Sequence, residues 1–148
     1  MAVKPRQDLV AIPHVGIDLW RASQAWKQRF VTAMAERGYG WFAEARGGLI
    51  EHIGAAGIAQ TALVARCGMT KQAVQQHLDA LEADGIIERV ADAIDSRRKL
   101  IRYTKAGLAT LAVAREVKRE IEAEYAALLG DRGLADLKRT LQRIGEAP

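Results

Sequence analysis

One stretch of the chain carries side chains that suit the recognition of nucleic-acid bases. Lys71, Gln72, Gln75 and Gln76 share the polar side of a helix predicted over residues 71–83. Gln offers a donor and an acceptor that match the adenine edge in the major groove, and Lys reaches guanine acceptors or phosphate. The alternative is an ordinary solvated face, although such a face would mix Glu with Lys. This one holds one charge and three amides.

A second group of candidate residues is cationic and lies on a predicted β-hairpin. No acid follows Asp95 in this segment, and its basic residues are Arg97, Arg98, Lys99, Arg102 and Lys105. Arginines on a projecting hairpin suit the minor groove of DNA, where the negative potential is enhanced when the groove narrows. The remaining cations would contact phosphates. A charged, solvated loop is the alternative for such a run, but its position directly after a predicted helix-turn-helix favours DNA contact.

The elements that position these two groups follow from periodicity and caps. A short helix is predicted over 60–66, a tight turn at Gly68, and the 71–83 helix after Thr70, which is a good N-cap. After Gly85 the period changes, and the short runs 86–90 and 99–103 predict a β-hairpin around a charged tip.

The rest of the chain is predicted to be helical. Only three prolines occur, at positions 5, 13 and 148, and helix-forming residues dominate the interior. The predicted helices cover residues 16–38, 41–53 and 105–129, with a last helix after a turn at Gly130–Asp131. The 41–53 helix contains Gly47 and Gly48, each of which costs roughly 1 kcal/mol relative to Ala. The fold class is therefore mainly α, with about six helices and a small hairpin.

Composition limits the function classes. A chain of 148 residues fits a single domain (1–148), and a net charge of +4 with a pI near 9.5 leans mildly towards an anionic partner. The single cysteine, Cys67, excludes an intramolecular disulfide, and no apolar run is long enough to span a membrane. We therefore expect a cytoplasmic protein without a membrane partner.

Residues 61–107 resemble the core of the MarR family of winged helix-turn-helix regulators. The family pattern joins Leu-Glu and a following Gly to a wing of the form Asp-x-Arg-Arg and then to Thr-x-x-Gly. Here the pattern is matched by Leu81-Glu82, Gly85, Asp95-Ser96-Arg97-Arg98, Thr104 and Gly107. The spacing agrees without a gap from Leu63 to Gly107, and the flanking helices match in number and order.

The resemblance implies roles for these segments. Residues 54–104 would form the DNA-binding winged helix-turn-helix, in which Thr70 to Gln76 read the major groove. Arg97 would enter the minor groove, held by a charge-assisted bond to Asp95. Helices within 14–38 and 105–146 would pack against a second subunit. The expected dimerisation residues are Ile17, Trp20, Leu128, Leu134, Leu137, Leu141 and Ile144.

Three positions depart from the family pattern. Tyr103 replaces a usual Leu and should still fill an apolar site. Gln76 stands where Arg is common, so that one DNA contact is weakened. Cys67 replaces a core Leu in the turn.

The function that these features favour is a transcriptional regulator that binds a palindromic double-stranded DNA operator as a homodimer. The alternatives are a winged helix used as a protein-interaction module, and a thiol redox sensor relying on Cys67. The residues do not form a recognisable catalytic set, a cofactor motif or a zinc pattern, so we expect neither an enzyme nor a metalloprotein. His77 is expected to be a half-buried packing residue.

Three tryptophans have two readings. Trp20, Trp26 and Trp41 either line a pocket for a small aromatic effector between the terminal helices and the winged domain, or they pack in the core and the dimer interface. The two readings are not exclusive.

Overall fold

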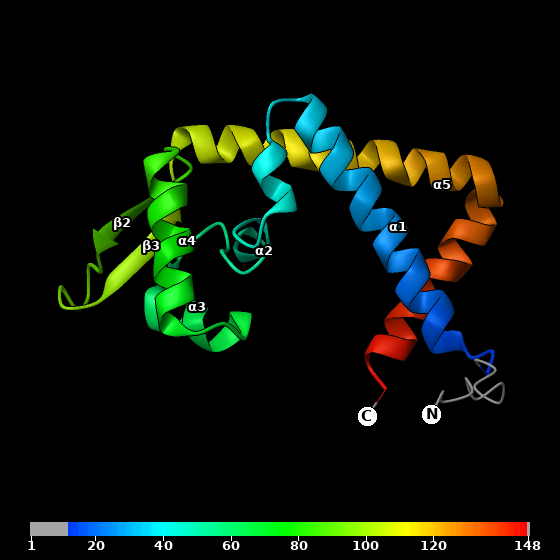
Figure 1. Cartoon of the computed structure of the whole chain (residues 1–148), viewed down its shortest axis with the longest axis horizontal. Coiled ribbons are helices and arrows are strands. Elements are labelled where there is room, and N and C mark those ends of the chain that lie inside the picture. Colours follow the sequence, from blue (N-terminus) through cyan, green and yellow to red (C-terminus); the bar gives the residue numbers. More distant parts are fainter. Residues whose placement is uncertain (1–11, 148) are drawn as a thin grey trace, which may run out of the picture.

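The computed structural model describes residues 12–147 and places two regions at opposite ends of one long helix (Figure 1). At one end lie the three-stranded sheet and two short helices, and at the other lie the N-terminal end of the first helix and the C-terminal end of the last helix. The elements are α1 (Val15–Glu36), a 3₁₀ turn η1 (Gly40–Ala43), α2 (Gly47–Ile50), β1 (Ile58–Ala59), α3 (Gln60–Cys67), α4 (Lys71–Ala83), β2 (Ile87–Ala91), β3 (Lys99–Tyr103) and α5 (Lys105–Gly145). The architecture is the mainly α winged helix-turn-helix that the sequence predicts.

The wing is a β-hairpin completed by a third strand. Strands β2 and β3 pair antiparallel, with Ile87 opposite Tyr103 and Ala91 opposite Lys99. The two-residue strand β1 pairs with the other edge of β3, with Ile58 opposite Ile101. Ile101 is fully buried in the middle of this sheet. The third strand was not predicted, because two residues are too few to show an alternating pattern.

The core of the winged region lies under α3 and α4. The apolar side predicted for α4 is confirmed, since Val74, Leu78 and Leu81 are fully buried. Leu63 of α3 and Leu49 of α2 complete this layer, each with no exposed surface. Burial of each such side chain stabilises the fold by about 1.5–3 kcal/mol. The opposite side of α4 is thereby held outward.

The predicted helix over residues 41–53 is wrong. The segment instead forms the 3₁₀ turn η1 and the single helical turn α2. A Cβ atom at Gly47 would lie 2.5 Å from the carbonyl oxygen of Phe42, so glycine allows the chain to fold back closely here. The contact between Phe42 and Phe30 of α1, whose ring centroids are 5.6 Å apart, then decides the local path. Within residues 12–147 there are five α-helices, and the last of them consists of two helical segments joined at Gly130, against the about six helices predicted.

The long helix α5 connects the two regions. It begins at the predicted cap, where the Thr104 hydroxyl accepts a hydrogen bond from the Gly107 amide at 3.0 Å. It turns sharply at Gly130, whose φ of 74° and ψ of 158° are not helical, so the predicted turn there is confirmed. Helix α1 crosses α5 (Figure 1), and ion pairs Arg29–Glu124 and Arg37–Glu120 join the two. No helix of the described part of the chain is both long and apolar enough to cross a bilayer.

Candidate nucleic-acid interface

Helix α4 presents its polar side as the sequence predicts. The Thr70 hydroxyl caps the helix by accepting from the Ala73 amide at 3.1 Å, and Gly68, with a φ of 65°, makes the left-handed turn that separates α3 from α4. Lys71, Gln72 and Gln76 are exposed. Gln75, the other predicted DNA-contacting glutamine of this helix, is half-buried. The side chains of α4 with donors and acceptors for bases are therefore accessible from outside.

The wing tip is ordered by hydrogen bonds that its backbone amides donate to its own acids. The Asp92 carboxylate accepts from the Ile94 amide at 2.8 Å, and the Asp95 carboxylate accepts from the Arg97 amide at 3.1 Å. The Arg97 side chain is 94% exposed, and its Nε lies 3.7 Å from the Asp95 carboxylate. That distance is too long for a hydrogen bond, so the Arg97 side chain forms an ion pair with Asp95 instead of the expected charge-assisted hydrogen bond. The hydrogen bond that Asp95 accepts comes from the Arg97 backbone amide.

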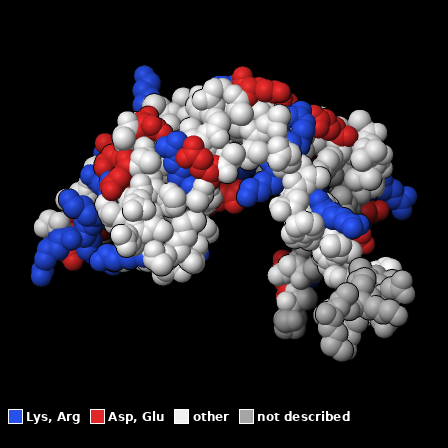
Figure 2. Space-filling view, in the orientation of Figure 1, with Lys and Arg blue, Asp and Glu red and all other residues white. Residues whose placement is uncertain are grey.

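One cleft joins the wing to the helix-turn-helix. It has a volume of about 420 Å³ and is lined by Ala59, Gln60, Thr61, Val64, Lys71, Arg97, Arg98 and Lys99. Four cations from two separate elements therefore share one concave surface. The blue side chains at the wing end in Figure 2 show that cations gather there, beside few acids. Such a surface attracts a polyanion.

Arg89 of β2 fixes the wing against α4, a contact that the sequence analysis missed. Its guanidinium binds the carboxylates of Asp79 and Glu82, with an Nε–Oε2 distance of 3.0 Å to Glu82, and its amide donates to the Glu82 carboxylate at 3.0 Å. The side chain is only 14% exposed. The side-chain hydrogen bonds from Arg89 hold the pKa values of Asp79 and Glu82 below their ordinary range. The available signal was the pair of charged residues, Glu88 and Arg89, within a predicted strand that is otherwise β-branched.

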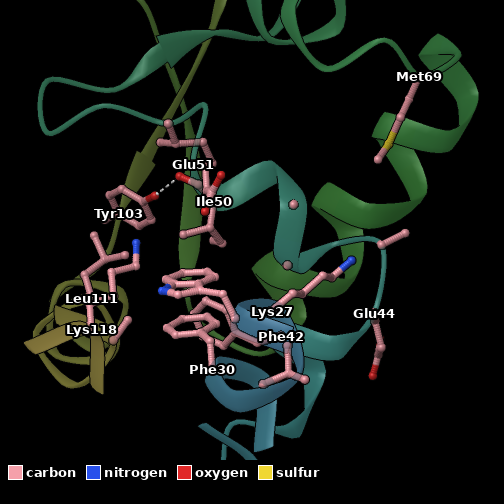
Figure 3. A pocket seen from close by; sticks show the side chains of 17 residues that line it. Lys27, Phe30, Phe42, Glu44, Ile50, Glu51, Met69, Tyr103, Leu111 and Lys118 are labelled. Atoms are coloured by element: carbon pink, nitrogen blue, oxygen red, sulfur yellow. Dashed lines mark hydrogen bonds between the residues drawn. The ribbon is translucent and has the colours of Figure 1, made fainter. Parts of the chain in front are cut away.

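A second cavity of about 590 Å³ lies between α1, α2, the sheet and α5 (Figure 3). Its apolar lining includes Phe30, Phe42 and Leu111, and its charged lining consists of two lysines and two glutamates, Lys27, Lys118, Glu44 and Glu51. The Lys118 Nζ lies 5.6 Å from the Phe30 ring centroid, within reach of a cation–π contact. The cavity is large enough for a small organic molecule.

The three tryptophans do not share this cavity. Trp26 lines it and stacks on Phe30, with ring centroids 5.4 Å apart. Trp41 stacks on Phe42 outside the lining, and Trp20 is 58% exposed on α1. Trp26 and Trp41 pack against the core, as the packing reading predicts, whereas the pocket reading holds for Trp26 and not for Trp20 or Trp41.

The remaining residues considered for chemistry are scattered. Cys67 is half-buried, and its Sγ lies 3.6 Å from the Val64 carbonyl oxygen. His77 is half-buried, as predicted. Among residues 12–147, His, Cys, Asp and Glu side chains do not form a group of three that could hold a metal ion. Tyr103 fills the apolar site of the usual Leu, and its hydroxyl donates to the Ile50 carbonyl at 2.7 Å.

Comparison with known proteins bears directly on this surface. Residues 45–98, which include the helix-turn-helix and the cationic wing tip, match the sequence model of the MarR family. This segment is therefore similar in sequence to the winged helix of MarR-family proteins. The match also confirms the resemblance drawn from the Leu81-Glu82 and Asp95-x-Arg97-Arg98 motifs.

Solved structures extend the likeness to nearly the whole chain. The transcriptional repressor CouR bound to a 23-mer DNA duplex is 25% identical, with a TM-score of 0.72 over 90% of this chain and 93% of that one. A probable transcriptional regulator from Pseudomonas aeruginosa is 26% identical, with a TM-score of 0.68 over 88% and 96%. The reduced form of MarR from E. coli is 19% identical, with a TM-score of 0.74 over 90% and 97%. None of the curated proteins matches the chain in sequence. The MarR-type fold therefore includes α1 and α5.

Proposed function

We propose that this protein is a cytoplasmic transcriptional regulator that binds a palindromic double-stranded DNA operator as a homodimer. The observation that carries the proposal is the single cleft in which Lys71 meets Arg97, Arg98 and Lys99 beside the exposed amides of α4. The α4 amides suit base edges in the major groove, and the wing cations suit the adjacent minor groove and phosphates. That CouR, of similar fold, has been solved on a DNA duplex supports this reading.

Homodimer formation is supported by apolar side chains at the far end of the molecule. Leu128 is 77% exposed, and Leu137, Leu141 and Ile144 follow at three- and four-residue steps on the last part of α5. Ile17 and Leu134 are half-buried and Trp20 is exposed in the same region of crossing helices. A second copy would cover this apolar stripe, and its two-fold axis would set the two α4 helices about 34 Å apart on the DNA.

The central cavity supports regulation by a small effector. Its aromatic wall suits a small aromatic ligand, and its two lysines and two glutamates offer polar partners of both signs. The ligand would cause the dimer to release DNA only if it binds the DNA-free arrangement more tightly than the DNA-bound arrangement.

The deciding experiment is the selection of bound sequences from a random DNA pool, followed by gel-shift titration of the selected site. We expect a palindrome, and we expect Arg97→Ala to weaken binding greatly while the dimer stays intact. Arg115→Ala is the control, because it removes the same charge from an exposed position on α5 outside the cleft. Unchanged affinity of Arg97→Ala would contradict the proposal, and weak retention on heparin without salt dependence would favour a protein-interaction module.

A further inference from the structure

One of the two hydrogen-bond partners of the Gln75 side chain lies outside α4. Gln60, the first residue of α3, donates from its Nε2 to the Oε1 of Gln75 at 2.7 Å. We propose that Gln60 and Gln75 read one base pair as a unit, which makes Gln60 a specificity-determining residue. The inference rests on the proposed DNA binding, and it adds a residue that neither the amide face of α4 nor the cationic wing includes.

The orientation of the Gln75 amide is fixed by the charges behind it. Its Nε2 donates to the Asp79 carboxylate at 3.0 Å, and the same carboxylate oxygen accepts from Arg89. An ionised carboxylate only accepts, so the NH₂ group of Gln75 must face Asp79 and its oxygen must face Gln60. Arg89 keeps the pKa of Asp79 low, so the carboxylate is ionised at neutral pH.

The same reasoning extends to Gln60. Because the Gln75 oxygen is an acceptor, the NH₂ group of Gln60 must point to it. A chain of hydrogen bonds therefore runs from Arg89 of the wing through Asp79 and Gln75 of α4 to Gln60 of α3. Three elements of the winged helix set the direction of both amides.

The paired amides keep the groups that base recognition needs. Each Gln has two N–H donors and two acceptor lone pairs, and neither makes a further hydrogen bond to protein within residues 12–147. Gln75 therefore keeps one donor and one acceptor, the combination that the adenine edge requires. Gln60 keeps its own oxygen and one N–H, and it lines the cleft that holds Lys71 and the wing cations.

Pairing also reduces the entropic cost of recognition. A free Gln side chain loses rotamer freedom when it binds a base, whereas two amides held by each other have already lost it in the folded protein. Removal of either partner should therefore reduce discrimination at the base pair that both serve, and leave contacts elsewhere in the half-site unchanged.

The test compares the sequences selected from a random DNA pool by the full-length wild type, Gln60→Met and Gln75→Met. Met keeps the length of the side chain and removes the amide. We expect each variant to lose roughly 10-fold of the preference at the same base pair of each half-site, with the rest of the palindrome retained. Arg98→Ala is the comparison, since loss of a phosphate contact weakens all sequences evenly and lowers the salt dependence.

A double-mutant cycle on the selected site separates a unit from two independent contacts. If the two amides act together, Gln60→Met has little further effect on that preference in a Gln75→Met background. Gln60→Glu is a second variant that retains a polar group of the same size. Its carboxylate cannot donate to Gln75, so this variant should also lose its preference for one base at that position of the half-site. Thermal unfolding of each variant establishes that it is folded.

Two results would overturn the inference, and they differ from failure of the proposed function. A Gln60→Met protein that selects the wild-type palindrome with unchanged preferences would show that Gln60 reads nothing. Loss of preference at a different base pair from Gln75→Met would show that the two amides are independent. A wild type that selects no sequence would refute the proposed function itself, and the role of the pair with it.

Discussion

The carboxylate of Asp95 accepts a hydrogen bond from the backbone of Arg97 and forms only a long ion pair with its side chain. The Arg97 amide donates to Asp95 at 3.1 Å, whereas the guanidinium Nε lies 3.7 Å away and the side chain is almost fully exposed. Asp95 therefore sets the shape of the wing tip and leaves the Arg97 side chain available for another partner. The first prediction follows from this division.

Asp95→Ala should weaken operator binding about 5- to 10-fold, because one hydrogen bond of roughly 1 kcal/mol no longer orders the tip before DNA binds. Fluorescence anisotropy with the selected operator measures the change. In an Arg97→Ala background the effect of Asp95→Ala on affinity should be small, because the ordered wing tip then has no Arg97 guanidinium to present to DNA. Equal effects in both backgrounds would mean that Asp95 acts independently of Arg97.

Arg89→Met should lower the free energy of unfolding by about 1–2 kcal/mol, because it removes charge-assisted hydrogen bonds to Asp79 and Glu82. Urea denaturation measures this loss. Arg102→Met is the matched control on the neighbouring strand, where a single exposed ion pair to Glu88 should contribute less than about 1 kcal/mol.

The free energy of unfolding at acid pH should depend on the same cluster, which is Arg89 with Asp79 and Glu82. Arg89 depresses the pKa values of Asp79 and Glu82 below their ordinary values of 3.8 and 4.5 in the folded protein. Their contribution is present above the ordinary values and is lost as pH falls through the depressed ones. The stability difference between wild type and Arg89→Met should therefore shrink below about pH 4. A difference that stays constant down to pH 2 would argue against the cluster.

Tyr103→Phe should destabilise the fold by about 1–2 kcal/mol at neutral pH, because the Ile50 carbonyl loses its partner in a buried site. Burial raises the pKa of Tyr103 to about 12. Since the hydroxyl of Tyr103 in the unfolded chain ionises near pH 10, the free energy of unfolding of the wild type should fall between about pH 10 and 12. The variant should lose less over that range, as measured by urea denaturation at each pH.

Gly107→Ala and Gly48→Ala should have opposite effects. A Cβ at Gly107 would lie 1.9 Å from the Ile86 carbonyl oxygen, so α5 would have to move away from the sheet, with a loss of several kcal/mol. A Cβ at Gly48, in α2, meets no atom within 4 Å, so Ala should stabilise by roughly 0.5–1 kcal/mol. Thermal unfolding of the pair checks both signs, and equal destabilisation would contradict the close approach at Gly107.

Leu141→Glu should convert the proposed dimer into a monomer near the chain mass of 16.2 kDa, because it places a charge in the apolar stripe of α5. Sedimentation velocity distinguishes the two species. Ala135→Glu adds the same charge to the opposite side of that helix and should leave the dimer unchanged. If both variants remain dimeric, the second copy binds elsewhere.

Sequence reasoning succeeded where local signals decide the structure. Thr70 caps α4 at the predicted residue, and the change of period after Gly85 locates the hairpin within one residue. The face of α4 was also predictable, because its alternation of apolar and polar residues has a helical period. These features depend on neighbours along the chain, so one sequence contains enough information to predict them.

Features that depend on distant residues were missed. The pairing of Ile58 with Ile101, the contact of Gln60 with Gln75 and the burial of Arg89 each join separate elements. The predicted helix at 41–53 failed for a related reason, since Phe42 of this segment packs against Phe30 of α1. Periodicity does not report such contacts, because it describes only how one segment would be buried.

The straight part of α5 runs from Lys105 to the turn at Gly130, so a small tilt of this segment at one end causes a large displacement at the other. At a rise of about 1.5 Å per residue it is about 37 Å long, so a tilt of about 5° displaces its far end by about 3 Å. That displacement is close to the roughly 3.4 Å step between successive bases along a strand. A tilt of about 5° about the turn at Gly130 is thus sufficient to shift the wing by nearly one base-pair step along the groove of the proposed operator.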